Sequence, residues 1–356
     1  MDTFAKLTAA ERKPYLEETA SRRTSTNTAI EKDFWICWTL KHLFALTGIP
    51  DLRFKGGTSL SKVFNLIERF SEDIDISLDR AALGFTGDRD LANPKLSNTK
   101  RRELDLELRA AIEKEVKTNI LSKLQKTFGS ILGKEGWTLA ESTEANEEMT
   151  LIFSYPPAFE YKEYLRPSIK IEFGRGDQQP SENVAVTPYA AEEFPDVFRE
   201  AKVTLPVLRC ERTFWEKVTL LHAENHRTDL TNFKPRMSRH WSDIAVMSTA
   251  QPFATLDFAL LDIVIAFKQI YFPANWAHYD TAIPGTLSII PNDALKKTLR
   301  EDYKQMREMF PRPPLSFEEV IERLQALQGR INAAKTSDTP QSAPSIDDSG
   351  RHASSV

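Results

Sequence analysis

The sequence predicts an α+β protein, in which a mixed α/β part is followed by an all-helical part and a polar tail. Three observations support this division. Residues 1–205 contain short stretches in which polar and aliphatic residues alternate, as in half-buried strands. Residues 206–333 repeat apolar side chains every three or four positions, as helices do. Residues 334–356 are rich in Ser, Pro and Asp without apolar periodicity, which predicts disorder.

The composition is that of a soluble globular protein, with 356 residues, 41% hydrophobic and 28% charged. The formal net charge of −4 provides no overall positive field, so a nucleic acid would need a local basic patch. Cys37 and Cys210 have no CxxC spacing and resemble reduced core residues. The most apolar run, 258–272, is interrupted by Asp262 and Lys268 and is too short to span a bilayer. We expect a cytoplasmic protein that uses no membrane.

The mixed part begins with a helix over 27–45, whose apolar residues recur at three and four positions. A strand at 52–54 leads into a glycine turn, and a helix over 60–70 follows. Residues 72–78 alternate acids with aliphatic residues and predict a second strand. A long charged helix is expected over 99–128.

The later elements follow from the same two periods. Further strands are predicted at 149–156, 167–174, 183–189 and 202–208. Helices are predicted at 211–226, 239–249, 254–271, 291–309 and 316–332. The last helix opens with Ser316 and Glu319 at the spacing of a capping box.

The glycine turn, KGGTS at residues 55–59, offers a place for a phosphate. The P-loop pattern GxxxxGK[ST] fails, because Lys62 is not preceded by glycine. The free backbone N–H groups at the start of the next helix can still hold a phosphate oxygen. Most Gly-Gly turns bind nothing, so the turn alone is weak support.

Asp73 and Asp75 leave the same face of the strand over 72–78, because side chains two residues apart point the same way. Two charges held so close repel each other, and Mg²⁺ relieves that repulsion. The alternative for an isolated DxD is a solvated strand face. A third carboxylate, Glu172, stands on the strand IKIEF at 169–173. Three carboxylates and a phosphate-sized turn suit two-metal phosphoryl chemistry.

These motifs carry a resemblance to a known family. The order KGGTSL, RFSEDIDIS and IKIEF resembles the nucleotidyltransferase fold of DNA polymerase beta type. Together with EKDFW, ERTFWEKVTLLH, SRHWSDIAVM and DYKQM, it resembles the AbiEii-type and MenT-type nucleotidyltransferase toxins, over residues 28–333. The resemblance implies a toxin of a type IV toxin–antitoxin or abortive-infection system. It implies transfer from an NTP, with Mg²⁺ or Mn²⁺, to an RNA acceptor such as the tRNA 3′ end. It also implies a cognate antitoxin, and we expect a monomer.

The resemblance assigns roles to residues of the mixed part. The turn that would cradle the triphosphate comprises Lys55, Gly56, Gly57, Thr58 and Ser59. Asp73 and Asp75 match the metal ligands, with Glu172 joining them or polarising the acceptor hydroxyl. Two departures from the family pattern are the threonine at position 58 and the glutamate as third acid. Ser71 is a further candidate, either hydrogen-bonded in the turn or close enough to the metals to accept a phosphate or nucleotide.

The helical part supplies Lys217, which interrupts an apolar stripe and by periodicity alone would extend to solvent. The resemblance implies that it faces the nucleotide phosphates, neutralising the β- and γ-phosphates together with the turn. Asp243 follows Arg239 by four residues, which allows a helix ion pair. The resemblance instead makes Asp243 a base for the acceptor hydroxyl or a partner that holds Lys217. Both roles stay open.

Residues 226–240 form the strongest local basic patch, which would hold acceptor phosphates or simply be a solvated linker. The acceptor-binding candidates are Arg236, Arg239 and His240. A lone histidine such as His240 is more often packed than catalytic, so the general base stays open among Glu172, Asp243 and His240. Two rival functions use the same residues: a metal-dependent phosphohydrolase or nuclease, and a non-catalytic nucleotide-binding module.

Overall fold

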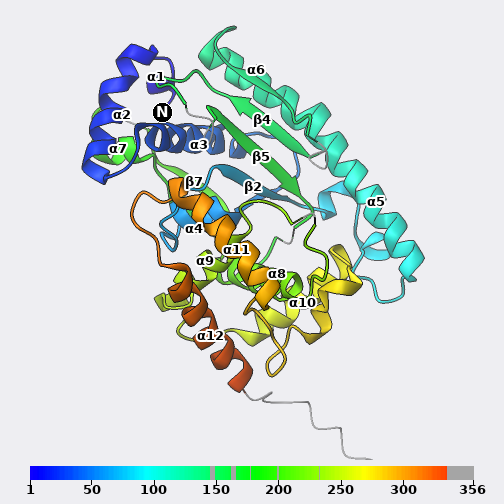
Figure 1. Ribbon diagram of the computed structural model, residues 1–356. Coiled ribbons are helices and arrows are strands. Elements are labelled where there is room, and N and C mark those ends of the chain that lie inside the picture. Colours follow the sequence, from blue (N-terminus) through cyan, green and yellow to red (C-terminus); the bar gives the residue numbers. More distant parts are fainter. Residues whose placement is uncertain (145–148, 162–165, 177, 199, 232, 335–356) are drawn as a thin grey trace, which may run out of the picture.

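The computed structural model describes residues 1–144, 149–161, 166–176, 178–198, 200–231 and 233–334. A central sheet is covered by the N-terminal helices and a long helix on its outer side, and the C-terminal helices gather below it (Figure 1). This arrangement confirms the predicted α+β class. The predicted disorder of the tail concerns residues outside the described ranges, apart from Ala334.

Seven strands form one mixed sheet in the order β3-β4-β5-β2-β1-β7-β6. β2 pairs in parallel with β5, and β1 with β7, while the other neighbours are antiparallel. The strands are β1 Leu52–Lys55, β2 Asp73–Leu78, β3 Thr138–Glu141, β4 Thr150–Ser154, β5 Ser168–Gly174, β6 Ser181–Val186 and β7 Val203–Leu208. The strands carrying the predicted acids are therefore adjacent at the centre of the sheet.

The helices of the mixed part cover the sheet and build its main core. They are α1 Asp2–Ala5, α2 Ala9–Arg23, α3 Asn27–Phe44, α4 Gly56–Lys62, α5 Asn98–Glu115, α6 Leu121–Leu132 and α7 Tyr189–Glu193. A π-helical turn, Val116–Ile120, joins α5 to α6, so the predicted long helix is continuous. From α3, Trp35 stacks on Tyr155 with ring centroids 5.4 Å apart, and Trp38 packs against Phe128 at 4.5 Å.

The helical part has its own apolar cluster, centred on residues such as Trp215 and Trp241. Its helices are α8 Cys210–Asn225, α9 Ser238–Met247, α10 Phe258–Tyr271, α11 Asp293–Gln305 and α12 Phe317–Ala333. The capping box of Ser316 and Glu319 is confirmed. Short 3-10 turns lie at Ala81–Leu83, Gly87–Arg89, Gln251–Phe253, Asn275–Ala277, Tyr279–Thr281 and Met306–Met309.

Side chains cross between the two parts of the chain. Leu60 and Ile67 pack in the cluster of the helical part, whereas Phe267 and Tyr271 of α10 pack in the main core. The domain boundary after residue 205 therefore stays a prediction. Within the described ranges, no helix has both the length and the apolar character needed to cross a membrane.

The helix predicted over 60–70 is wrong. α4 begins at Gly56 and ends at Lys62, and the chain then turns through Asn65, whose φ is +51°. The backbone N–H of Leu66 donates to the carbonyl of Leu60 at 2.9 Å and closes the end of the helix. The short strand β3 was not predicted, because its pattern of one buried residue among exposed ones is weak.

Candidate active site

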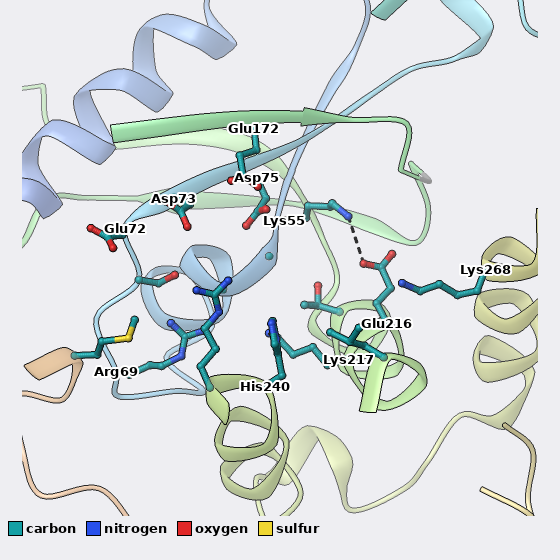
Figure 2. Close-up of a pocket in the computed structure, with 17 residues that line it drawn as sticks. Lys55, Arg69, Glu72, Asp73, Asp75, Glu172, Glu216, Lys217, His240 and Lys268 are labelled. Carbon is teal, nitrogen blue, oxygen red and sulfur yellow. Dashed lines mark hydrogen bonds and ion pairs between the residues drawn. The ribbon is translucent and has the colours of Figure 1, made fainter. Parts of the chain in front are cut away.

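A cavity of about 210 Å³ lies between the centre of the sheet and helices α8, α9 and α10. Most of the carboxylates lie on the sheet side and most of the cations on the opposite side (Figure 2). The exceptions are Lys55, which stands beside Asp75 on the sheet, and Glu216, which lies on α8. The lining residues are Lys55, Gly56, Gly57, Arg69, Ser71, Glu72, Asp73, Asp75, Glu172, Thr213, Glu216, Lys217, Leu220, Arg239, His240, Lys268 and Met309. We call the sheet side, with Glu72, Asp73, Asp75 and Glu172, the acid wall. We call the opposite side the helical wall; it comprises Arg69, Glu216, Lys217, Arg239, His240 and Lys268, together with Asp243, which pairs with Arg69 and Lys217.

The acid wall follows from the register of the sheet. Asp75 stands opposite Glu172 on β5 and opposite Lys55 on β1, and residues paired in this way share one face. Asp73 lies two residues before Asp75 and faces the same way, while Ile74 is buried in the core. The alternation in the sequence thus placed three carboxylates on one face, and the structure brings them into one cavity.

Both aspartates are held in an environment that disfavours their charge. Burial raises the pKa of Asp73 to about 6, and Asp75 and Glu72 add repulsion. Burial also raises the pKa of Asp75, although Lys55, Lys217 and Arg239 partly oppose the shift. A divalent cation would remove this cost, and carboxylate oxygens are the ligands that Mg²⁺ prefers.

The donor set therefore fits a hard cation bound by two protein carboxylates and completed by water and phosphate oxygens. Within the part of the chain that the structure describes, no three His, Cys, Asp or Glu side chains are grouped closely enough to hold a metal unaided. Glu172 as a direct ligand accordingly stays a prediction.

The glycine turn is shaped by close approach to the acid wall. Gly56 has φ +78°, and a Cβ there would overlap the Asp75 carboxylate. A Cβ on Gly57 would lie 2.8 Å from Ser71 Oγ and 3.0 Å from Arg69 Nη2. Both glycines are thus required where the turn meets the cavity, and Ser71 lies beside them.

The side chains of Thr58 and Ser59 stabilise the turn itself. Their hydroxyls are buried and donate to backbone carbonyls, Thr58 to Asp73 at 2.5 Å and Ser59 to Gly56 at 2.8 Å. Neither residue lines the cavity. The Thr58 hydroxyl ties the turn to β2, and the Ser59 hydroxyl closes the turn on itself. The part of both residues in binding the triphosphate stays a prediction.

Asp243 does not itself line the cavity, but it holds two cations of the helical wall, Arg69 and Lys217. Arg69 donates to its two oxygens at 2.7 and 2.8 Å, and Lys217 Nζ lies 3.0 Å from Oδ2. Burial would raise the pKa of Asp243, but Arg69 and Lys217 hold it well below its ordinary value. A carboxylate so fully engaged is a poor base, and the arrangement favours the alternative that Asp243 holds Lys217. The ion pairs of Asp243 are thus with Arg69 and Lys217 rather than with Arg239, the partner that the spacing in the sequence allowed.

His240 and Lys217 are tied together in the cavity. His240 Nδ1 lies 3.0 Å from Lys217 Nζ. Burial and the charges of Lys217 and Arg239 hold the pKa of His240 well below its ordinary value, so the ring is neutral and Nδ1 accepts from the lysine. Burial also lowers the pKa of Lys217, although Asp243 opposes that shift.

Of the basic patch, Arg239 and His240 line the cavity. Arg236 instead pairs with Glu72 at 3.0 Å, and Lys32 reaches the other oxygen of Glu72 at 2.5 Å. Burial would raise the pKa of Glu72, but Lys32 and Arg236 lower it. The acid next to Asp73 is therefore already neutralised by protein cations.

Five polar residues of the cavity were missed in the sequence: Arg69, Glu72, Thr213, Glu216 and Lys268. Glu72 and Glu216 each adjoin a predicted site residue, which was a usable signal. Lys268 interrupts the most apolar run of the chain, as Lys217 interrupts its own stripe. Arg69 lay inside a predicted helix, and nothing in that pattern indicated its contact with Asp243.

Comparisons with known proteins identify the family of this chain. The family described as "Nucleotidyl transferase AbiEii toxin, Type IV TA system" matches residues 38–323. Among solved structures, the chain is similar to MenT4, a nucleotidyltransferase toxin from Mycobacterium tuberculosis H37Rv. The identity is 18% and the TM-score 0.47, with 90% of this chain and 89% of that chain covered. No curated protein matches this chain. Because the family match spans most of its length, the chain belongs to the AbiEii nucleotidyltransferase toxins of type IV toxin–antitoxin systems.

Proposed function

We propose that this nucleotidyltransferase moves a nucleotide from an NTP to the 3′ end of an RNA, with tRNA as the acceptor, and depends on Mg²⁺. Such an addition would block translation and growth. The observation that carries the proposal is the pair of opposed walls: under-neutralised carboxylates face fixed cations across one cavity. This polarity suits a metal–triphosphate, which presents a cation to one wall and anionic oxygens to the other.

Asp73 and Asp75 would hold the cation, which when bound supplies charge neutralisation at the phosphates. On the helical wall, Lys217 is kept in place by Asp243 and His240 and presents a compact charge to the phosphate oxygens. The backbone at Gly56 and Gly57 allows the close approach of a ligand that a side chain would prevent. Catalysis would then be mostly positioning and charge stabilisation.

The acceptor hydroxyl would form a bond to the α-phosphorus while the bond to the leaving pyrophosphate breaks. Its proton needs a carboxylate nearby, and we assign that role to Glu172. Of the three candidates, Asp243 is engaged by Arg69 and Lys217, and neutral His240 accepts from Lys217. Glu172 faces the cavity as the register neighbour of Asp75. Arg239 is placed to meet an acceptor phosphate at the same cavity.

Family membership implies an antitoxin partner and a nucleotide substrate. We further propose that the toxin acts in the cytoplasm as a monomer. The two walls both come from one chain, so the site needs no second copy.

The test is incubation of the purified protein with total RNA, Mg²⁺ and each of the four NTPs, labelled at the α-phosphate. We expect labelled tRNA that is longer by one or more nucleotides, and no labelling by the Asp75→Asn variant. Shortened RNA would indicate a nuclease instead. Binding of Mg²⁺-NTP without labelling of any RNA would indicate a binding module and would overturn the proposal.

A further inference from the structure

One end of the cavity is formed by α8, α10 and the end of β1, and of its residues only Lys55 belongs to the predicted nucleotide turn. Glu216 of α8 points toward Lys55 of β1, and Lys268 extends toward it from α10 (Figure 2). Thr213, one turn before Lys217 on α8, lines the same cavity. We call Lys55, Thr213, Glu216 and Lys268 the basic end.

The basic end carries more positive than negative charge. Glu216 accepts from Lys55 Nζ at 3.4 Å and from Arg212 Nε at 3.2 Å. Burial would raise the pKa of Glu216, but Lys55, Lys268 and Arg212 lower it to about 2. One carboxylate thus faces three cations. Burial lowers the pKa of Lys268 to about 8, and Lys55 and Arg212 add to that shift against the attraction of Glu216.

The ammonium group of Lys268 has N–H donors that are not used in hydrogen bonds to described residues. Its ammonium lies 4.9 Å from the centre of the Phe272 ring. Among the described residues, no ion pair or hydrogen bond engages the Lys268 ammonium, whereas Lys55 is held by Glu216. Glu216 attracts this ammonium only from beyond ion-pair distance, so a second anion beside the half-buried Lys268 would be favourable.

The Thr213 hydroxyl is unsatisfied as well. Thr213 is 3% exposed, and Oγ1 has no hydrogen-bond partner in the described structure. Thr219 on the same helix shows the usual arrangement, because its hydroxyl donates to the carbonyl of Trp215 at 2.8 Å. A buried hydroxyl without a partner costs stability, and a ligand oxygen in the cavity would satisfy it.

Resting on the proposed function, we infer that Lys55, Thr213 and Lys268 form a subsite for the terminal phosphate of the NTP. Lysine ammonium groups and a hydroxyl donor match the oxygens of a phosphate. The acid wall would place the metal near the α-phosphorus, so the basic end receives the far end of the same chain of phosphates. Glu216 acts as a positioning residue that holds Lys55. The enzyme should therefore select triphosphates over diphosphates through residues of α8 and α10.

Calorimetry with Mg²⁺ and four classes of probe tests the subsite: the NTPs, the NDPs, the NMPs and inorganic tripolyphosphate. We expect the wild type to bind NTPs about tenfold more tightly than NDPs, a difference typical of one or two charge-assisted hydrogen bonds. Thr213→Val and Lys268→Gln should each remove most of that preference and weaken tripolyphosphate binding about fivefold to tenfold. NMP binding should not change, and Lys268→Arg should restore the preference.

The matched controls are Thr219→Val, which removes a satisfied hydroxyl, and Lys304→Gln, which removes an exposed ammonium paired with Glu301. Thr213→Val should leave the melting temperature unchanged or raise it, whereas Thr219→Val should lower it. Because Lys268 is half-buried, its variant remains informative if Thr213→Val proves unstable. Unchanged NTP preference in Lys268→Gln, or an equal loss for NTP and NMP, would overturn the subsite. RNA labelling by the wild type is a separate measurement. Loss of the NTP preference therefore tests the subsite, and absence of labelling tests the transfer reaction.

Discussion

The acid wall and the helical wall contain the same kinds of residue in opposite electrostatic states. On the acid wall, burial and mutual repulsion raise the pKa values of Asp73 and Asp75. On the helical wall, neighbouring cations lower the pKa values of Asp243 and Glu216 despite burial. The carboxylates of the acid wall would be stabilised by a cation from solution. Those of the helical wall are already paired with arginine and lysine side chains of the chain itself.

This difference teaches that the two walls respond differently to the same substitution. Neutralising a carboxylate of the acid wall relieves repulsion, so it should reduce activity without lowering the free energy of unfolding. Neutralising a carboxylate of the helical wall leaves buried cations without a partner, so it should reduce activity and also lower the free energy of unfolding.

The largest effect is expected at the acid wall. Asp75→Asn should reduce nucleotide transfer by about 10³-fold or more, because the charge stabilisation of the metal–triphosphate is lost. Its melting temperature should equal or exceed that of the wild type in EDTA. The exposed Asp262 on α10 provides the control, since Asp262→Asn should leave transfer unchanged. Full transfer activity in the Asp75→Asn variant would contradict the functional role assigned to the acid wall.

At the helical wall, Asp243→Asn should lower the free energy of unfolding by about 3–5 kcal/mol, because Arg69 and Lys217 stay buried without their partner. Urea denaturation measures this loss. Glu301→Gln breaks an exposed ion pair and should cost under about 1 kcal/mol. If Asp243→Asn retained full stability and lost only transfer, Asp243 would be acting directly on the acceptor.

A pH effect of intermediate size should come from Asp73. Its pKa is about 6 in the folded chain against an ordinary 3.8, so the folded state binds this proton more tightly than the unfolded state. Stability from this group is therefore lost as the pH rises from about 4 to 6, by up to about 3 kcal/mol. The difference between wild type and Asp73→Asn, measured in EDTA, isolates the group. Identical pH profiles for both proteins would contradict the environment assigned to Asp73.

The smallest effect is expected at the turn. Thr58→Val should lower the free energy of unfolding by about 1 kcal/mol, because the carbonyl of Asp73 loses its donor. The KM for NTP should change less than about twofold. A large rise in KM at unchanged stability would instead return the hydroxyl to the nucleotide site.

The acid wall was more predictable from the sequence than the helical wall. Period-two alternation fixes the faces of Asp73, Asp75 and Glu172 as soon as they are placed on strands. The ion pair between Arg69 and Asp243 spans 174 residues, and no local pattern encodes such a contact. The orientation of Thr58 and Ser59 depends on where α4 begins, and helix boundaries are weakly specified by sequence.

The central claim is that the acid wall is completed by a divalent cation. Thermal unfolding of the wild type and of the Asp73→Asn, Asp75→Asn double variant, with and without Mg²⁺ and without nucleotide, tests it most directly. We expect the double variant to unfold at the higher temperature in EDTA. Saturating Mg²⁺ should raise the melting temperature of the wild type by several degrees and leave that of the double variant unchanged. An equal rise in both proteins, or no rise in the wild type, would contradict the claim.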